Sequence, residues 1–293
     1  MRVLVTGASG LLGRSVLARL QQQADIQATG TAFSRAGDQL IALNLTDADQ
    51  VQRVLDQVRP EVVIHCAAER WPDRCAQQPE SAWQLNVDST RALAEACATR
   101  GAQLAYISTD YVFDGQNAPY RHDAPTNPLN FYGRSKLAGE QVVLESGNHW
   151  VLRLPWLFGP TANLQESGIT ALLDIVADKT PVKIDDWAIR FPTSVEEVAD
   201  VIHQCLARIA AGSAFDGIYQ WSGSKATTRY QLALMVADIA GVSSDHIQPD
   251  SNPVMAEPRP YNCQLDTSRL RDQGITADEP LRTQLARTLA PFL

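Results

Sequence analysis

A glycine-rich turn near the amino terminus constrains this sequence more than any other feature. The stretch Thr-Gly-Ala-Ser-Gly-Leu-Leu-Gly follows the apolar run 2–6 directly and opens an amphipathic helix pattern at 11–23. In a strand–turn–helix unit, Gly7 permits the tight turn, Gly10 lets the backbone approach a pyrophosphate, and Gly13 lets the helix pack closely on the strand. The helix N-terminus supplies free N–H groups and positive dipole for phosphates. The pattern predicts a dinucleotide site, and the alternative is a glycine-rich turn without a ligand.

Strand and helix patterns alternate through the first half of the chain. Short apolar runs typical of buried parallel strands lie at 2–6, 26–33, 61–67, 103–108 and 150–154. Amphipathic helix patterns lie between them at 11–23, 48–58, 81–100 and 132–146. Gly101 stands where the third helix should end, as a left-handed C-cap glycine would. We therefore predict an α/β fold, a Rossmann-type doubly wound parallel sheet.

The alternation loosens after residue 154, where prolines and glycines interrupt the chain. We expect a helix near 165–178, a short segment at 182–184, a helix from two overlapping capping boxes at 193–197 to 211, a strand at 217–221, a helix at 228–240 and an ordered irregular loop at 249–262. No repeat or flexible linker separates the two parts. We assign residues 1–154 and 194–221 to a dinucleotide-binding Rossmann domain, and residues 155–193 and 222–293 to a smaller C-terminal substrate-binding region.

Composition argues against several classes of function. A formal net charge of -8 disfavours a nucleic-acid partner, which needs a basic face. The five cysteines are scattered without a Cys-x-x-Cys pair, and the five histidines show no metal-ligand spacing, so we expect neither disulfides nor a metal. No run approaches the ~20 apolar residues of a membrane helix, and no signal-peptide apolar region opens the chain. We expect a cytoplasmic protein.

The end of the second predicted strand bears on which dinucleotide is bound. NAD-specific proteins of this architecture normally place Asp or Glu there for the ribose hydroxyls. This sequence has Phe33-Ser34-Arg35 instead, and no carboxylate before Asp38. A serine hydroxyl and a guanidinium suit a 2′-phosphate, because arginine donates paired hydrogen bonds to phosphate oxygens. The sequence favours NADP(H) over NAD(H), the alternative being that Arg35 is only a solvated loop residue.

Tyr132 and Lys136 are four residues apart at the start of a predicted helix, so they share one face. A free tyrosine has a pKa near ~10, and a neighbouring ammonium is expected to lower that pKa toward neutrality. Thr109 ends a predicted strand and can offer its hydroxyl to a substrate carbonyl, while Tyr132 protonates the alkoxide as hydride arrives. Exposed Tyr–Lys pairs and strand-ending threonines are common by themselves. The occurrence of the glycine turn, then Thr109, then the Tyr132–Lys136 pair along one chain predicts a catalytic site.

The chain resembles the extended short-chain dehydrogenases/reductases. Within them it is similar to dTDP-4-dehydrorhamnose reductases and, more closely, to the non-catalytic regulatory β subunits of methionine adenosyltransferase. The resemblance covers nearly the whole chain and rests on the motifs VTGASGLLGR from Val5, HCAAER from His65, LNVD from Leu85, STDYVFDG from Ser108, YGRSK from Tyr132, RFPT from Arg190, WSG from Trp221 and RPYN from Arg259.

The resemblance implies a role for each matching position. The catalytic triad would be Thr109, Tyr132 and Lys136. The cofactor would contact the glycines of the turn and Ser9, Leu11, Leu12, Phe33, Ser34, Arg35, Asn44, Leu45, Cys66, Ala67, Ala68 and Arg70, as well as Tyr132 and Lys136. The substrate would meet Asp110, Trp156, Arg190 and Arg259.

The two resemblances imply different classes of function. For a reductase, the Thr–Tyr–Lys set is complete, and Trp156 matches a tryptophan that nucleotide-sugar reductases keep beside the substrate, although a core aromatic is the alternative. A dehydratase would need Asp-Glu after the hydroxyl residue, whereas Asp110 is followed here by Tyr111. The RFPT stretch at 190–193 departs from the Gly-Ala-Pro-Thr of typical rhamnose-forming reductases and agrees with the β-subunit relatives.

We therefore predict NADPH-dependent reduction of a 4-keto group on a nucleotide-activated deoxysugar. The alternative is an NADP-binding regulatory subunit of methionine adenosyltransferase without catalysis of its own. The sequence leaves open the sugar, the stereochemistry of the new hydroxyl, and whether the chain forms a homodimer or a complex with methionine adenosyltransferase.

Overall fold

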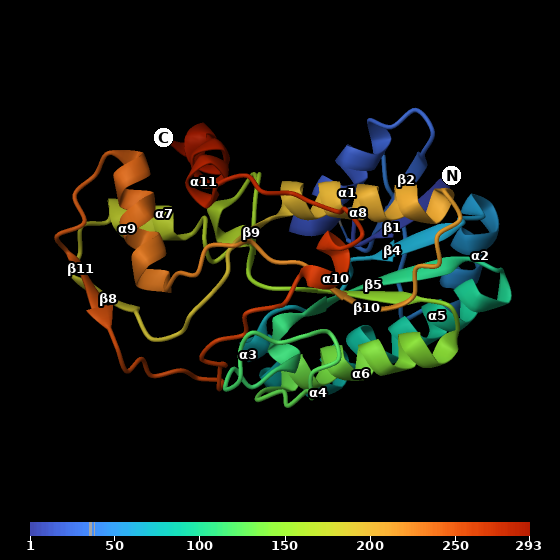
Figure 1. Cartoon of the computed structure of the whole chain (residues 1–293), viewed down its shortest axis with the longest axis horizontal. Coiled ribbons are helices and arrows are strands. Elements are labelled where there is room, and N and C mark those ends of the chain that lie inside the picture. Colours follow the sequence, from blue (N-terminus) through green and yellow to red (C-terminus); the bar gives the residue numbers. More distant parts are fainter. Residues whose placement is uncertain (35–36, 38) are drawn as a thin grey trace.

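A seven-stranded parallel sheet lies at the centre of the computed structural model, which describes residues 1–34, 37 and 39–293 (Figure 1). In spatial order its strands are β10 (Gly217–Gln220), β6 (Trp150–Leu154), β5 (Gln103–Thr109), β4 (Val62–His65), β1 (Arg2–Thr6), β2 (Gln27–Ala32) and β3 (Ile41–Ala42). The strand order reverses between β1 and β4, and in open sheets of this kind ligands bind at the carboxyl ends beside that reversal.

Helices cover both faces of the sheet, which confirms the predicted doubly wound fold. Alternate residues of a strand point to opposite faces, so Val3 and Val5 join one core while Leu4 joins the other. The first core is covered by α1 (Leu11–Gln21) and α8 (Val195–Ala210), and the second by α2 (Ala48–Val58), α5 (Ser89–Thr99) and α6 (Phe131–Ser146) (Figure 1). Gly101 has a φ of 67° after α5, which confirms the predicted left-handed C-cap.

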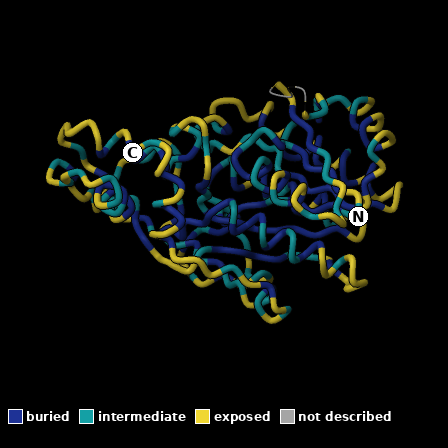
Figure 2. The backbone as a smooth tube through the Cα atoms, turned by 90° about the horizontal axis from the view of Figure 1, so that it is seen from above, coloured by how far each residue is buried: buried dark blue, intermediate teal, exposed yellow. Residues whose placement is uncertain are grey.

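A smaller layer, at the left of Figure 1, has its own hydrophobic core. It contains α7 (Leu172–Ala177), α9 (Arg229–Ala240), α11 (Leu281–Leu289) and a parallel pair formed by β8 (Val182–Asp185) and β11 (Ile247–Asp250). A short parallel pair, β7 (Leu157–Phe158) and β9 (Thr193–Ser194), lies between the end of β6 and the start of α8. Figure 2 shows the buried backbone running through the sheet and the exposed residues at the outer loops.

The remaining elements are short. They are α3 (Pro72–Gln77), α4 (Pro79–Trp83), the π-helical turn η1 (Gln84–Asp88), the 3-10 turns η2 (Asp110–Val112), η3 (Leu164–Glu166) and η4 (Ala290–Phe292), and α10 (Ser268–Arg271). None of the helices in the described part of the chain has the length and apolar character that a membrane crossing demands.

The helix predicted at 81–100 is interrupted by the π-helical turn η1. This wider turn directs Asn86 into the protein, where its amide nitrogen donates to Glu69 O and to Ser135 Oγ, both at 3.0 Å, and its oxygen accepts from Glu69 N at 2.9 Å. The turn therefore fixes the loop after β4 against α6. The π-helical turn could not be predicted from helical periodicity, because the partners of Asn86, Glu69 and Ser135, are distant in the sequence.

Three predictions in the second half are wrong in part. The helix near 165–178 is confined to α7, because the chain at Ser167 turns so that its hydroxyl donates to Leu157 O at 2.8 Å. The double capping box at 193–197 does not form. Ser194 accepts from Glu196 N at 3.2 Å, and the Glu197 carboxylate instead accepts from the side chains of Trp221 and Gln284. The loop predicted at 249–262 begins inside β11, which pairs with β8.

Candidate functional site

A cavity of about 850 Å³ opens at the carboxyl ends of the sheet strands and is lined by both parts of the chain. It brings together residues predicted from nine separate stretches of the sequence. They are Gly7, Ser9, Gly10, Leu11, Leu12, Gly13, Phe33, Ser34, Asn44, Leu45, Cys66, Ala67, Ala68, Arg70, Thr109, Asp110, Tyr132, Lys136, Trp156, Arg190 and Arg259. Arg35, the remaining predicted residue, lies outside the described residues.

The glycine turn has the backbone geometry that its sequence predicts. Gly7 has a φ of 65°, and a Cβ there would lie 2.8 Å from Ala67 N. A Cβ at Gly13 would lie 2.3 Å from Gly7 O, so only glycine allows this approach of α1 to the turn. Gly10 is the N-cap of α1 and provides no side-chain acceptor. The first-turn N–H groups of the helix therefore lie beside the cavity without a capping side chain, as an anion site requires.

The end of β2 adds an aromatic surface to the same cavity. The Phe33 side chain is 73% exposed, and Ser34 and Asn44 line the cavity beside it. Asn44 Oδ1 accepts from Thr46 N at 3.1 Å and from Thr46 Oγ1 at 2.9 Å, which holds this loop in place. An exposed ring next to small polar groups can contact a planar base and the polar groups attached to it.

Helix α6 carries Tyr132 and Lys136 into the cavity, and β5 ends there at Thr109. Asn130 caps the helix by accepting from Gly133 N at 2.9 Å, which sets where the first turn begins. The Lys136 side chain is buried, and its Nζ lies 3.9 Å from the ring centroid of Tyr106. Thr109 Oγ1 donates to Asp110 Oδ1 at 3.2 Å. A phenol, an ammonium and a hydroxyl thus share one wall of the cavity.

The electrostatics of this wall differ from the sequence-based expectation. Burial raises the pKa of Tyr132 above its usual value, and the hydrogen bond with Thr109 offsets this only in part. Burial also lowers the pKa of Lys136 to about 7, against the opposing attraction of Glu140. The pKa of Tyr132 in this structure is therefore raised and not lowered toward neutrality as predicted. The physical reason is that desolvation penalises the charged forms of both groups.

Asp110 is a buried carboxyl next to Thr109. Burial raises its pKa to about 6, and the positive charge of Arg190 opposes that shift. The Arg190 guanidinium is held in place, since its Nη1 donates to Pro260 O at 2.9 Å and to Ile189 O at 3.1 Å. A buried carboxyl with a raised pKa and a fixed guanidinium that acts on its charge therefore both line the cavity.

Two further arginines from the smaller layer line the cavity, and sequence reasoning named only Arg259. Among the described residues, the buried Nε atoms of Arg229 and Arg259 have no hydrogen-bond partner. Burial and the neighbouring charge of Arg259 lower the pKa of Arg229. Arg259 Nη2 lies 3.8 Å from Asp73 Oδ2. The other oxygen of that carboxylate, the buried Oδ1, has no hydrogen-bond partner among the described residues. Two arginines whose like charges repel each other at the wall of one cavity form a site suited to an anion.

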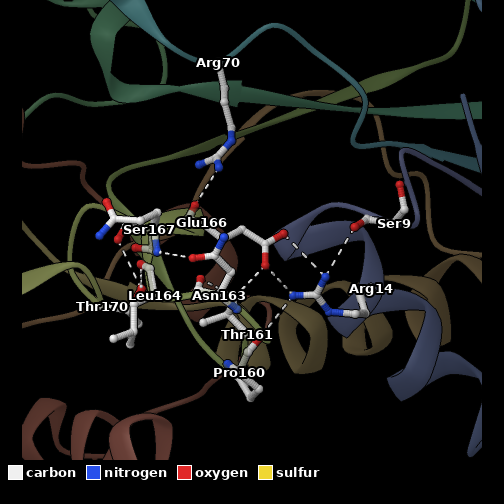
Figure 3. Close-up of polar contacts among 11 residues, drawn as sticks. Ser9, Arg14, Arg70, Pro160, Thr161, Asn163, Leu164, Glu166, Ser167 and Thr170 are labelled. Carbon is white, nitrogen blue, oxygen red and sulfur yellow. Dashed lines mark hydrogen bonds and ion pairs between the residues drawn. The ribbon is translucent and has the colours of Figure 1, made fainter. Parts of the chain in front are cut away.

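Trp156 both lines the cavity and packs against the core of the smaller layer, so the two alternatives for this residue are not exclusive. Its indole lies against Gly168, where a Cβ would be 3.0 Å from Trp156 Cζ2. Arg70, at the opposite side, lies over the ring of Trp71 at 4.4 Å and donates to Glu166 O at 2.6 Å (Figure 3). Among the described residues, no group of three or more His, Cys, Asp or Glu side chains is arranged to hold a metal ion.

Comparison with known proteins places the chain in a family. The family profile described as the RmlD substrate binding domain matches residues 1–293. The chain belongs to this family. It is 43% identical over 295 residues to the methionine adenosyltransferase 2 subunit beta of Bos taurus, covering 100% of this chain and 88% of that protein. It is 35% identical over 286 residues to the dTDP-4-dehydrorhamnose reductase of Streptomyces griseus, covering 96% of this chain and 90% of that protein.

Solved structures agree with this RmlD-family assignment. The dTDP-4-dehydrorhamnose reductase of Bacillus anthracis, solved in complex with NADP, has a TM-score of 0.84 at 28% identity and covers 99% of this chain and 98% of that chain. The UDP-glucose 4-epimerase of Thermotoga maritima has a TM-score of 0.84 at 20% identity, covering 100% of this chain and 98% of that chain, and shows the likeness of fold alone. The predicted resemblance to extended short-chain dehydrogenases/reductases is confirmed.

Several cavity residues of this RmlD-family chain were missed from the sequence. Asp73, Trp71, Asp185 and Arg229 line the cavity. Arg229 follows the N-cap of α9, where Thr228 and Gln231 form a capping box, and that motif predicts a helix start but nothing about a binding role. Trp71 and Asp73 lie where the chain leaves β4 and begins α3, and Asp185 ends β8 of the smaller layer. The packing of the two layers brings Asp185 and Arg229 to the site.

Proposed function

We propose that this chain binds NADP(H) and reduces the 4-keto group of a nucleotide-activated deoxysugar. The observation that carries the proposal is the single cavity shared by the glycine turn, the hydroxyl of Thr109 and the Tyr132–Lys136 pair. The residues present fit a dinucleotide, because glycines keep side-chain atoms out of the turn and the first-turn N–H groups of α1 are uncapped. Phe33 and Ser34 support NADP(H), since no carboxylate stands at either position.

Within this proposal the cavity has a cofactor side and a substrate side. Residues 1–154 and 194–221 form the NADP(H)-binding domain, and residues 155–193 and 222–293 form the substrate-binding region. The glycine turn with Ser9, Leu11 and Leu12 holds the pyrophosphate, Phe33, Ser34, Arg35, Asn44 and Leu45 hold the adenosine end, and Cys66, Ala67, Ala68 and Arg70 lie toward the nicotinamide end. Asp110, Trp156, Arg190 and Arg259 meet the nucleotide sugar.

The proposed chemistry uses the wall formed by β5 and α6. When bound, the reduced cofactor supplies the hydride. Thr109 donates a hydrogen bond to the substrate carbonyl oxygen, and Tyr132 transfers its phenolic proton to that oxygen, so the ketone becomes an alcohol. Lys136 in its ammonium form stabilises the phenolate left on Tyr132. Burial strongly disfavours a phenolate that has no compensating charge. The proton transfer from Tyr132 therefore requires Lys136 in its ammonium form.

The arginines support a substrate that carries a diphosphate. Arg229 and Arg259 line the cavity, the buried Nε of each has no hydrogen-bond partner among the described residues, and Arg190 adds a third positive charge. Arginine binds phosphate oxygens through paired, charge-assisted hydrogen bonds. A diphosphate would offset the repulsion between Arg229 and Arg259, which a neutral sugar alone would not do.

The test is to incubate the purified chain with NADPH and dTDP-4-dehydrorhamnose and to follow cofactor oxidation. We expect turnover by the wild-type chain and none above background by Tyr132→Phe, which keeps the ring but loses the proton. Tyr132→Phe should still bind NADPH, because the phenol oxygen is one contact among many. The absence of wild-type turnover would rule out this substrate.

A second candidate function is regulation of methionine adenosyltransferase. It is favoured by the 43% identity over 100% of this chain to a protein named as a beta subunit of that enzyme. In this case the cavity binds NADP(H) without catalysis. The chain should then co-elute with a methionine adenosyltransferase catalytic subunit at micromolar concentration and change its kinetics. Tyr132→Phe should leave that complex intact, so the same variant separates the two functions.

A further inference from the structure

A segment that follows β7 is tied by side chains to the first turn of α1 and to the loop after β4. We call residues 160–168 the strap. The Arg14 guanidinium, on the first turn of α1, donates through Nη2 to Glu166 Oε2 at 2.9 Å and to Pro160 O at 3.1 Å (Figure 3). Arg14 Nη1 also donates to Ser9 O at 3.3 Å. One side chain therefore connects the backbone of the glycine turn to both ends of the strap.

A second tie comes from the loop after β4. Arg70 Nη2 donates to Glu166 O at 2.6 Å, and Thr161 Oγ1 donates to Glu166 Oε2 at 2.6 Å within the strap. Figure 3 shows the Arg70 and Arg14 guanidinium groups approaching Glu166 from different elements. Glu166 is thus the residue at which the strap meets two separate parts of the cofactor side.

The strap then reaches the substrate side within two residues. Ser167 Oγ donates to Leu157 O at 2.8 Å, and Gly168 lies against the Trp156 indole. Ser167, Gly168 and Trp156 all line the cavity. A continuous path of contacts therefore runs from the Ser9 carbonyl of the glycine turn, through Arg14 and Glu166, to Trp156.

The ties do not have the form of a stabilising core contact. The Arg14 side chain is 41% exposed and that of Glu166 is 15% exposed, and ion pairs with such access to water contribute little to the stability of a fold. They do restrict a segment whose Gly168 lies against the indole of Trp156, a residue that lines the cavity. Residues that join two ligand sites through few, breakable contacts are suited to couple them.

We propose that Glu166 is a positioning residue that couples occupancy of the glycine turn to the placement of Trp156 for the second ligand. This inference rests on the proposed function, because it takes the two ends of the cavity as sites for a dinucleotide and a nucleotide diphosphate. A ligand that orders the Ser9 backbone fixes Arg14, Arg14 fixes Glu166, and the strap then holds Trp156. By reciprocity, each ligand strengthens the binding of the other by the same factor.

The test measures the affinity for thymidine diphosphate by titration calorimetry, with and without saturating NADPH. For the wild-type chain we expect NADPH to tighten thymidine diphosphate binding by about fivefold or more, the lower range of measured couplings between sites. Glu166→Ala should reduce that ratio to near one, and Glu166→Gln should retain part of it, because an amide can still accept from Arg14 and Thr161. Hydrogen exchange at 157–168 should be faster in Glu166→Ala.

The matched control is Arg19→Ala. Arg19 is also on α1 and is also in a partly exposed ion pair, with Asp200 of α8, but it does not touch the strap. It should keep the wild-type ratio, and thermal unfolding verifies that each variant is folded. Three outcomes overturn the coupling and leave the proposed function standing: independent binding of the two ligands by the wild type, an unchanged ratio in Glu166→Ala, or an equal loss in Arg19→Ala. A wild-type chain that binds neither ligand overturns both.

Discussion

Arg153 and Glu140 form an ion pair that is almost fully sealed from water. Arg153 Nη2 donates to Glu140 Oε2 at 2.7 Å and Nε donates to Oε1 at 2.9 Å, while each side chain is 2% exposed. Glu140 Oε1 also accepts from the Ser108 hydroxyl at 2.5 Å. Glu140 therefore fastens α6 to the ends of β5 and β6. It lies one helical turn after Lys136, and its partner Ser108 directly precedes Thr109.

Breaking this pair from one side should destabilise the whole fold. Glu140→Gln leaves a buried guanidinium without its countercharge, and we expect a loss of about 3 kcal/mol or more in the free energy of unfolding, measured by urea denaturation. Asp123→Asn is the control, because its pair with Arg121 is largely exposed and should change stability by less than about 1 kcal/mol. An equal loss of unfolding free energy in Glu140→Gln and Asp123→Asn would show that burial does not set the contribution of the Arg153–Glu140 pair.

Lys136 should make stability depend on pH in the alkaline range. Its pKa in the folded chain is about 7, below the ordinary value of 10.5 expected after unfolding. Between these two values the unfolded chain holds a proton that the folded chain has released, so the folded state gains stability as pH rises from about 7 to about 10.5. We expect the stability of the wild type relative to Lys136→Met to increase across that window and to be constant below it.

Deprotonation of Lys136 should lower the rate of catalysis over the same pH range in which it raises stability. Lys136 acts in its ammonium form in the proposed reaction, so turnover by the wild type should fall as pH rises through the pKa of the lysine. A stability difference between wild type and Lys136→Met that is flat from pH 7 to 10 would show that the ammonium stays charged in the folded chain.

Replacing the third glycine of the turn should damage both packing and cofactor binding. A Cβ at Gly13 would lie 2.3 Å from Gly7 O and 3.0 Å from Ala8 Cα, both main-chain atoms of the turn. We expect Gly13→Ala to cost about 1–3 kcal/mol of stability and to weaken NADPH binding measured by fluorescence titration. Gly101→Asn is the control, since a Cβ there meets nothing within 4 Å and asparagine tolerates a φ of 67°. Unchanged NADPH affinity in Gly13→Ala would count against the pyrophosphate site.

Arg229 should affect substrate binding without supporting the fold. Its buried Nε has no partner among the described residues, and its charge is opposed by Arg259. We expect Arg229→Met to raise KM for the nucleotide sugar by about tenfold or more while stability is unchanged or increased, because a lost charge-assisted hydrogen bond costs ~1.5–3 kcal/mol. Arg282→Ala, which removes an exposed pair with Asp238, should leave KM unaltered. A clear loss of stability in Arg229→Met would assign this residue a structural role instead.

The features that depend on short-range spacing could be predicted from the amino-acid sequence. Three glycines from the end of a strand to the first turn of a helix define the phosphate turn, and apolar runs alternating with amphipathic patterns define the doubly wound sheet. The spacing of Tyr132 and Lys136 places both on one face of α6, and both line the cavity. These signals are readable because the helix and strand periods fix which way neighbouring side chains point.

The tertiary structure decided what depends on segments distant in the chain. Arg229 and Asp185 reach the cavity only through the packing of the smaller layer on the sheet, and Glu166 meets Arg14 across 152 positions of sequence. The direction of the Tyr132 pKa shift was also decided there, since desolvation depends on everything that surrounds a group in space. The local sequence specifies the chemical groups and, through helix and strand periods, the direction of neighbouring side chains. The burial of a site and the charges around it depend on every segment that packs against it.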